Sequence, residues 1–145
     1  MHTMAGTGPE QAGPGSGPEN EAEALTSLAS LRRLRRELSR GTGELAVLSL
    51  LQGQRRYGYQ LLKLLRSPDL GSLEIKEGTL YPLLHRLEDA GHIAATWEAE
   101  GRARPRKYYT ITVAGQRHLA VLRDEWSSLT ESMRQLLDML DEVRR

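Results

Sequence analysis

The residues that could carry chemistry in this sequence of 145 residues are its arginines, its lysines and its four histidines. The sequence contains no cysteine. The lack of cysteine excludes disulfides and thiolate metal sites. His85 and Asp89 are one helical turn apart, but such a pair without a third ligand is weak evidence for a metal site. No nucleophile stands in a pattern with a general base. We therefore expect no catalytic residue, no metal, no cofactor and no enzymatic activity.

The basic residues are concentrated in the middle of the chain. Residues 24–118 contain 16 arginines and lysines and 9 acidic residues, a net charge of +7, whereas residues 1–23 and 119–143 are acidic. A basic segment between acidic ends is typical of a protein that binds a polyanion. Solvated helix faces would give the same imbalance, so the charge distribution alone leaves both interpretations open.

The apolar runs of the chain are short, and none approaches the roughly 20 residues that a membrane-spanning helix needs. The N-terminus also lacks the charged and apolar regions of a signal peptide. We therefore expect a soluble, intracellular protein with one domain and helical extensions. Residues 1–19 are rich in glycine and proline and are expected to form a disordered tail.

An amphipathic helix is predicted for residues 20–38. Asn20 and Glu23 have the spacing of a capping box at its start. Leucines recur every three or four positions on one side, and arginines lie between them. The leucine face needs a partner surface, while the arginines either contact phosphate or form a solvated face.

Two further helices are predicted before residue 66. Residues 42–53 contain ELAVLSLL, which is too apolar for a helix with one wet side, so this helix belongs in the core. Residues 55–65 form the next helix. Its predicted apolar face consists of Tyr57, Leu61 and Leu65.

A fourth helix and two strands follow. Residues 76–90 have helical apolar spacing, and the predicted core face is Leu80, Leu83 or Leu84, Leu87 and Ala90. Residues 93–98 alternate with a period of two, which predicts a strand whose covered face holds Ile93, Ala95 and Trp97. Residues 106–112 are rich in aromatic and β-branched residues and predict a returning strand. The predicted fold is mainly α with a small β-hairpin, in the order of a winged helix-turn-helix over residues 39–112.

A long helix is predicted for residues 113–145, with Thr112 as its cap. From residue 119 its apolar residues alternate between spacings of three and four to the end of the chain, which is a heptad seam. The seam residues are Leu119, Leu122, Trp126, Leu129, Met133, Leu136, Leu140 and Val143. The seam favours a homodimer, although a helix packed on its own domain is the alternative.

The stretch GTLYPLLHRLEDAGHI, followed by GRARPRKYYTIT and Gly115, resembles the signature of the PadR family of bacterial transcriptional regulators. The upstream RGTGELAVLSLLQGQRRYGYQLLKLL is similar to the first two helices of that family. The resemblance covers about residues 39–118, and the C-terminal helix has the length seen in the short subgroup. The chain departs from the family pattern at His92, where an aliphatic residue or tryptophan is common, and in the wing, where GRARPRK replaces GRPRK. The resemblance implies a DNA-binding regulator in the bacterial cytoplasm, associated with the nucleoid when bound.

The resemblance implies that the segment 76–90 is the recognition helix of the DNA major groove, and the family's pattern includes Gly78 and Pro82, which are unusual residues inside a helix. If the helix begins near Glu77, Pro82 lacks a donor for the Gly78 carbonyl, and the glycine lets the backbone adjust. If Thr79 is the N-cap, Pro82 lies in the first turn, where its missing N–H costs little. Either start would let a narrow helix end approach phosphates or base edges closely. Tight packing between helices is the alternative.

The exposed side of this helix and the wing, residues 99–107, are expected to contact DNA. His85 and Arg86 point outward and can reach base acceptors or phosphates. Tyr81 either packs on the second helix or offers its hydroxyl to phosphate. The wing suits phosphates or the minor groove, with a solubilising loop as the alternative. The expected DNA-binding residues are Lys76, Gly78, Thr79, Tyr81, Pro82, His85, Arg86, Arg104, Arg106 and Lys107.

Trp126 is bulky for a coiled-coil seam. Some PadR-like regulators bind flat aromatic compounds between paired tryptophans, and DEWSS in this chain looks similar. A small aromatic ligand at Trp126 is therefore one hypothesis, and packing in the core or interface is the other.

The function predicted from the sequence is that of a transcriptional repressor that binds a two-fold symmetric operator as a homodimer. The expected partners are double-stranded DNA, a second copy of the chain and a small aromatic effector, and no membrane. A winged-helix module that binds a protein or ligand without an operator is the alternative. Binding to RNA or to DNA without a preferred sequence is a weaker third hypothesis.

Overall fold

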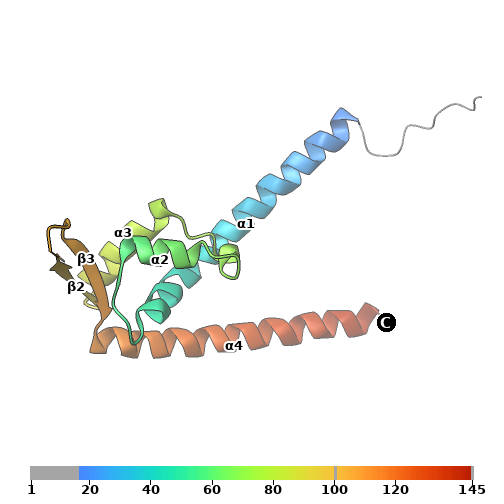
Figure 1. Ribbon diagram of the computed structural model, residues 1–145. Helices are drawn as coiled ribbons and strands as arrows, with labels where there is room; N and C mark the ends of the chain where they lie inside the picture. The colour runs from blue at the N-terminus through green and yellow to red at the C-terminus, as the bar shows by residue number, and fades with distance from the viewer. Residues whose placement is uncertain (1–16, 100, 145) are drawn as a thin grey trace, which may run out of the picture. The chain divides into compact units, whose positions relative to one another are not determined.

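The computed structural model describes residues 17–99 and 101–144, and Figure 1 labels the four α-helices and the two longer strands that these residues form. In order they are α1 (Pro18–Leu51), β1 (Arg56–Tyr57), α2 (Gly58–Leu65), the short 3-10 helix η1 (Gly71–Leu73), α3 (Glu77–Asp89), β2 (Ile93–Glu98), β3 (Arg106–Ile111) and α4 (Val113–Arg144). The chain divides into two units, one ending at Leu34 and one beginning at Arg35, so α1 belongs to both. Most of the predicted tail, residues 1–16, lies outside the described residues.

Helix α1 begins two residues before its predicted start. The carbonyl of Gly17 accepts hydrogen bonds from the backbone N–H groups of Asn20 at 3.1 Å and Glu21 at 3.3 Å. Pro18 is the first helical residue, a position that favours proline because its φ is already helical and its missing N–H has no helical partner there. Pro18 therefore determines the start of the helix, and the predicted capping box is wrong.

The predicted break between the first two helices is also wrong, because α1 continues through Gly41 and Gly43. A glycine inside a helix costs up to about 1 kcal/mol relative to alanine. At Gly43 close packing offsets this cost, since an added Cβ would lie only 3.1 Å from Cδ2 of Leu83 in α3. Gly43 thus allows α1 and α3 to approach each other closely instead of ending a helix.

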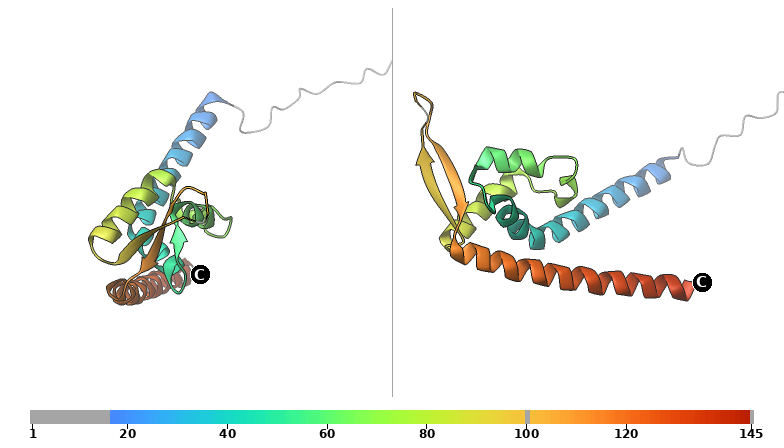
Figure 2. Two further views of the ribbon diagram at one scale, coloured as in Figure 1. Left: turned by 60° about the vertical axis from the view of Figure 1, so that its left-hand side comes forward. Right: turned by 60° about the horizontal axis from the view of Figure 1, so that its bottom comes forward.

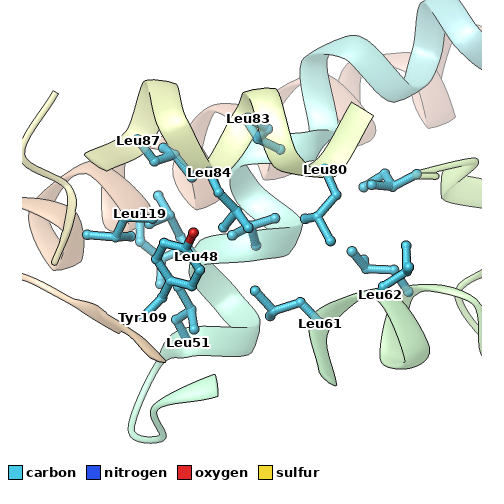
Figure 3. Close-up of a cluster of buried hydrophobic side chains, with 14 residues drawn as sticks. Leu48, Leu51, Leu61, Leu62, Leu80, Leu83, Leu84, Leu87, Tyr109 and Leu119 are labelled. Carbon is cyan, nitrogen blue, oxygen red and sulfur yellow. The ribbon is translucent and has the colours of Figure 1, made fainter. Parts of the chain in front are cut away.

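The core of the second unit lies where α1, α2, α3 and the sheet meet. In Figure 3, leucines of α3 point toward Leu48 and Leu51 of α1 and toward Leu61 of α2. The largest fully buried side chains are Leu48, Leu51, Leu61, Leu65, Leu80, Leu84, Leu87, Ile93 and Val47. Burying each such side chain contributes about 1.5–3 kcal/mol, so this cluster holds α3 firmly with one face inward. The core position predicted for ELAVLSLL is confirmed.

The residues before α2 form a strand that the sequence did not predict. Arg56 and Tyr57 pair with Tyr109 and Tyr108 of β3. Nε of Arg56 also donates a hydrogen bond to the carbonyl of Leu50 at 2.7 Å. The helix predicted to begin at residue 55 therefore begins only at Gly58. Its apolar face is confirmed for Leu61 and Leu65, whereas Tyr57 lies in the strand.

Strands β2 and β3 form the antiparallel hairpin seen in Figure 2, and β1 lies on the other side of β3. The register pairs Ile93 with Ile111 at the base and Glu98 with Arg106 near the tip. Ile93 is buried, but Trp97 is 68% exposed. The prediction that Trp97 is covered is therefore wrong, because the outer part of the hairpin extends past the core.

Helix α4 follows β3 after a single residue, Thr112, which caps the helix as predicted. Its hydroxyl accepts a hydrogen bond from the N–H of Gly115 at 3.0 Å and donates one to the carbonyl of Gly91 at 2.6 Å. Gly115 itself lies against the backbone, since an added Cβ would be 2.0 Å from the carbonyl oxygen of His92. The first turn of α4 is thus fixed to the corner that follows α3.

A pair of histidines reinforces this junction. The imidazole rings of His92 and His118 stack with centroids 4.2 Å apart and planes 11° apart. Nε2 of His118 also lies 3.0 Å from a carboxylate oxygen of Glu44 in α1. The start of α4 is therefore attached both to the end of α3 and to α1.

The apolar seam of α4 divides into two parts. Leu119 is only 2% exposed, and Leu122 packs half-buried against the same core. The assignment of Leu119 to a dimer interface is therefore wrong, because this side chain is already buried in its own domain. The later seam residues are exposed, namely Trp126, Leu129, Met133, Leu136, Leu140 and Val143.

The leucines of the predicted amphipathic segment, in the N-terminal part of α1, are exposed. They are Leu25, Leu28, Leu31, Leu34 and Leu38. Within the described residues, no helix combines the length and the apolar content that crossing a membrane requires.

Candidate nucleic-acid interface

Helix α3 begins at Glu77, with Lys76 as its N-cap in an extended conformation. The carbonyl of Lys76 accepts hydrogen bonds from the N–H groups of Thr79 at 3.0 Å and Leu80 at 2.8 Å. Of the two predicted starts, the one near Glu77 is confirmed, and Thr79 is not the N-cap. Pro82 therefore lies inside the helix, opposite the carbonyl of Gly78, where it can form no hydrogen bond.

The surroundings of Gly78 decide between close approach and tight packing. Among the described residues, an added Cβ at Gly78 would meet no atom within 4 Å outside the local helix backbone. Gly78 and Pro82 are both exposed. Packing against another helix therefore does not explain the glycine, and the prediction of a narrow, open helix end remains.

The two faces of α3 are separated nearly as predicted. Leu80, Leu83, Leu84 and Leu87 are buried, and Lys76, Thr79, Pro82, His85, Arg86 and Asp89 are exposed. Ala90 is exposed, so its predicted core position is wrong. It is the C-cap, with its N–H bonded to the carbonyl of Arg86 at 3.0 Å, and the chain turns at Gly91, whose φ is +79°. The core face of the helix ends one residue earlier.

Tyr81 packs on α2, which the sequence predicted as the third helix, and not on the second predicted helix, residues 42–53. A Cβ added at Gly58, the first residue of α2, would lie 2.8 Å from Cε1 and 3.1 Å from the hydroxyl of Tyr81. The ring of Tyr81 therefore lies directly over the start of α2, and its side chain remains 38% exposed. Gly58 is the residue that makes room for it.

A second arginine lies beside Arg86. Arg36 of α1 and Arg86 line the same depression of about 500 Å³, together with Ser39, Glu74, Gly78, Thr79 and Pro82. Arg35, which precedes Arg36 in the sequence, forms an ion pair with Glu74, with 3.5 Å between a guanidinium nitrogen and a carboxylate oxygen. The depression thus brings two guanidinium groups to the narrow end of α3. Arg36 was absent from the predicted contact residues, although the arginines between the leucines of α1 indicated this role as one alternative.

The wing carries exposed cations and aromatic rings. Arg104 and Arg106 are exposed, and the guanidinium carbon of Arg106 lies 4.7 Å from the ring centroid of Tyr57. The guanidinium carbon of Arg55 lies 4.4 Å from the ring centroid of Tyr108, which shares a face of β3 with Arg106, and Arg55 pairs with Glu98. Arginine can stack on an aromatic ring and still offer donors to an anion. The wing can therefore present fixed guanidinium groups.

Lys107 differs from the other predicted contacts because it has an acidic partner. Its Nζ lies 3.1 Å from a carboxylate oxygen of Glu88 and 5.3 Å from the ring centroid of Tyr109. The hydrogen bond to Glu88 raises the pKa of Lys107 above its ordinary value, and burial raises the pKa of the Tyr109 hydroxyl. Lys107 lies in β3, and a phosphate would compete with Glu88 for it.

The chemistry available to this surface is recognition of anions and hydrogen-bond acceptors. The predicted contacts on α3, from Gly78 to Arg86, are exposed, and Lys76 is the N-cap. Arg106 and Lys107 follow in β3, with their side chains on opposite faces of the sheet. In the described part of the chain, no group of three or more histidines or carboxylates is arranged to hold a metal ion. Helix, turn, recognition helix and hairpin together define a winged helix-turn-helix protein.

The chain belongs to the PadR-like family of transcriptional regulators. The model of this family, "Transcriptional regulator PadR-like family", matches residues 47–121, more than half of the chain. An uncharacterised protein of Lysinibacillus sphaericus is 34% identical over 98 residues, which cover 68% of this chain and 90% of that protein. The family resemblance predicted from the sequence is confirmed, and the family is one of regulators and not of enzymes.

Solved structures of the same family are similar to this fold. A PadR family transcriptional regulator from Eggerthella lenta is 40% identical, with a TM-score of 0.65, and the match covers 79% of this chain and 96% of that one. A PadR-like transcriptional regulator from Bacillus cereus is 29% identical, with a TM-score of 0.60, over 70% of this chain and 96% of that one. The predicted winged-helix fold class is therefore confirmed.

Proposed function

We propose that this protein is a transcriptional repressor that binds a two-fold symmetric DNA operator as a homodimer. The observation that carries the proposal is the open N-terminal half of α3, where nothing packs against Gly78 among the described residues. Arg36 and Arg86 lie beside it and supply positive charge for phosphates. In this proposal, α3 enters the major groove and the wing contacts the backbone or minor groove.

Dimerisation is proposed through the outer part of α4. Leu129, Met133, Leu136 and Leu140 are each about half exposed in the single chain and recur with heptad spacing. An apolar stripe of this length is a surface that a second copy would cover. On this proposal, residues 39–112 form the DNA-binding domain and residues 113–145 the dimerisation helix. The two recognition helices would then contact half-sites about 10 bp apart between centres, or a multiple of that distance.

Replacement of one seam residue tests the dimer. Leu136→Asp places a charge in the proposed interface without disturbing the core, because Leu136 is 50% exposed. Analytical ultracentrifugation should find a 16.2 kDa monomer for this variant and a dimer for the parent. Val121→Asp is the matched control, since Val121 is exposed on the same helix but outside the seam. A monomeric parent protein, still monomeric on its best oligonucleotide, would contradict the proposal.

A small aromatic effector at Trp126 remains part of the proposal. Trp126 lies in the seam and is 45% exposed. A ligand between two such rings would act by binding one arrangement of the dimer more tightly than another. Titration of the protein with a panel of aromatic compounds tests this, with Trp126→Ala as the control.

Selection of bound sequences from random duplex DNA tests the function as a whole. The expected result is a two-fold symmetric consensus sequence, with affinity that falls steeply as salt concentration rises. Enrichment of no sequence would favour binding without a preferred site. No binding at all would favour an interaction module without an operator.

A further inference from the structure

The β2–β3 hairpin presents Trp97 and Lys107 side by side on one face of the sheet. The register pairs these two residues directly, and directly paired residues of antiparallel strands point to the same face. Ile93 and Tyr109 lie on that face nearer the base of the hairpin, and both are buried in the core. Trp97 continues this face but is 68% exposed. The face that packs on the core therefore has an open outer end in the single chain.

Trp97 shares a recess with exposed residues of α3. The recess has a volume of about 440 Å³, and its walls include Tyr59 of α2, Tyr81 and His85 of α3, and Lys107. Tyr81 and His85 are exposed and belong to the proposed DNA contacts. The recess therefore lies between the two parts of the proposed DNA-binding surface, the helix α3 and the hairpin.

The recess combines exposed aromatic rings with positive charge. Of the described residues, nine line the recess, and none of these nine is acidic. Trp97 and Tyr59 are both more than half exposed, and grouped apolar surface of this kind marks an interaction site because it is costly in water. Lys107 adds an ammonium group, although Glu88 shares it. A partner that fits the recess must offer apolar and anionic groups in close alternation.

A strand of duplex DNA has this alternation, because deoxyribose rings and phosphates follow each other along its backbone. The backbone of one strand also forms the ridge between a major groove and the neighbouring minor groove. A protein that places a helix in the major groove and a hairpin against the backbone or minor groove has to straddle this ridge. In the proposed complex, the space between those two elements is the recess, so the ridge is the part of the DNA that lies nearest to Trp97.

We propose that the recess receives the sugar–phosphate ridge of one DNA strand, with the indole of Trp97 packed on a deoxyribose and Lys107 at a neighbouring phosphate. The inference rests on the proposed function and extends it, since Trp97 and Tyr59 are not among the contacts that the sequence predicts. Trp97 then supplies an apolar contact, which releases no counterions, whereas Lys107 supplies an ionic one. Because every sequence has the same ridge, the contact of Trp97 contributes affinity without selecting a sequence.

Salt titrations with two labelled duplexes test this division. One duplex carries the sequence selected from random DNA, and the other has the same length and an unrelated sequence. Trp97→Ala should raise the Kd for both duplexes about tenfold, as removal of an aromatic ring stacked on a nucleotide does, and should leave the dependence on salt unchanged. Lys107→Ala should reduce the slope of log Kd against log salt concentration by about 0.9 for each bound subunit.

Two further variants control for indirect effects. Trp97→Phe keeps an aromatic ring and should bind both duplexes more tightly than Trp97→Ala. Val121→Ala is the matched control, because Val121 is 58% exposed on α4 and does not line the recess. It should bind as the parent protein does. Since Trp97 is exposed, Trp97→Ala should also keep the urea unfolding midpoint of the parent protein.

The fluorescence of Trp97 reports the contact directly. Trp97 and Trp126 are the two tryptophans of the chain, so Trp126→Phe leaves Trp97 as the single fluorescent indole. Acrylamide should quench Trp97 strongly in the free protein, because the ring is exposed. Saturating duplex DNA should shield the ring and reduce this quenching.

The outcomes separate this contact from the proposed function. A parent protein that binds neither duplex would refute the proposed function and this contact with it. If the parent protein binds DNA, equal affinity of Trp97→Ala or unchanged acrylamide quenching of Trp97 would overturn the contact and leave the proposed function intact. A loss of affinity confined to the selected sequence would show that Trp97 reads bases and not the ridge.

Discussion

The open position of Gly78 makes Gly78→Ala a test of why a glycine stands in the recognition helix. Alanine is favoured over glycine inside a helix by about 0.5–1 kcal/mol, and the added methyl group meets no described atom within 4 Å outside the local helix backbone. The free energy of unfolding should therefore rise by up to about 1 kcal/mol, which corresponds to a few degrees in Tm. A stabilising substitution in this position would exclude a packing role for the glycine.

The same methyl group should impair operator binding, because it separates the helix end from the DNA backbone. Loss of one charge-assisted hydrogen bond costs about 1.5 kcal/mol. If the protein binds as the proposed dimer, two helix ends lose this bond and the Kd should rise about a hundredfold, as measured by fluorescence anisotropy with a labelled operator. Gly41→Ala is the matched control, since Gly41 is an exposed glycine inside α1 whose added Cβ also meets nothing within 4 Å. It should raise stability without changing affinity.

Two results would refute the reasoning about Gly78. If Gly78→Ala binds the operator as tightly as the parent protein, close approach of this helix end is not its function. If the variant is destabilised in urea unfolding, the glycine is needed for the backbone to adjust opposite Pro82, and the expected stabilisation is wrong. A change of affinity in the Gly41→Ala control would indicate an indirect effect through α1.

Three further predictions concern the junction and the charged contacts. Gly115→Ala should lower the free energy of unfolding by more than the roughly 1–3 kcal/mol typical of overpacking, because the new Cβ would lie 2.0 Å from the carbonyl oxygen of His92. A urea unfolding midpoint equal to that of the parent protein would contradict this. In selection from random DNA, Arg86→Ala should change the preferred sequence, whereas Lys107→Ala should weaken binding to all sequences about equally. The same altered preference in both variants would show that the two roles are wrongly assigned. Because Glu88 raises the pKa of Lys107, the stabilisation from this pair is present at neutral pH and is lost as the pH rises above the ordinary value of 10.5. Glu88→Gln should remove that alkaline loss from the pH dependence of urea unfolding, and an unchanged profile would exclude the pair as its source.

The elements with strong local patterns were predictable from the sequence. Apolar spacing was sufficient for the buried face of α3, and the cap at Thr112 followed from residue types near the start of α4. The errors arise where distant residues decide the local structure. Arg56 is a strand residue only because β3 pairs with it, and a glycine suits position 43 inside α1 because Leu83 lies close to it. Neither partner is adjacent in the sequence.

The candidate site was predictable in its residue types but not in its partners. The outward face of α3 follows from helical periodicity, and the exposed arginines of the wing follow from its composition. The pairing of Lys107 with Glu88 could not be inferred, because these residues lie on different elements that only the folded chain brings together. The same holds for Arg36 beside Arg86 and for the exposure of Trp97.

The attachment of α4 to the corner after α3 has a consequence for how such a regulator changes over time. Thr112 is the only residue between β3 and α4, and Gly115 and His118 hold the helix start in place. Because no flexible linker lies between β3 and α4, a small rotation of α4 about its first turn produces a displacement that grows along the helix and is largest at its C-terminal end. In the proposed dimer, substitutions far out on α4 would therefore alter which spacing of DNA half-sites fits, while the proposed DNA contacts stay the same. On that proposal, target choice would diverge between related chains through the geometry of α4 alone.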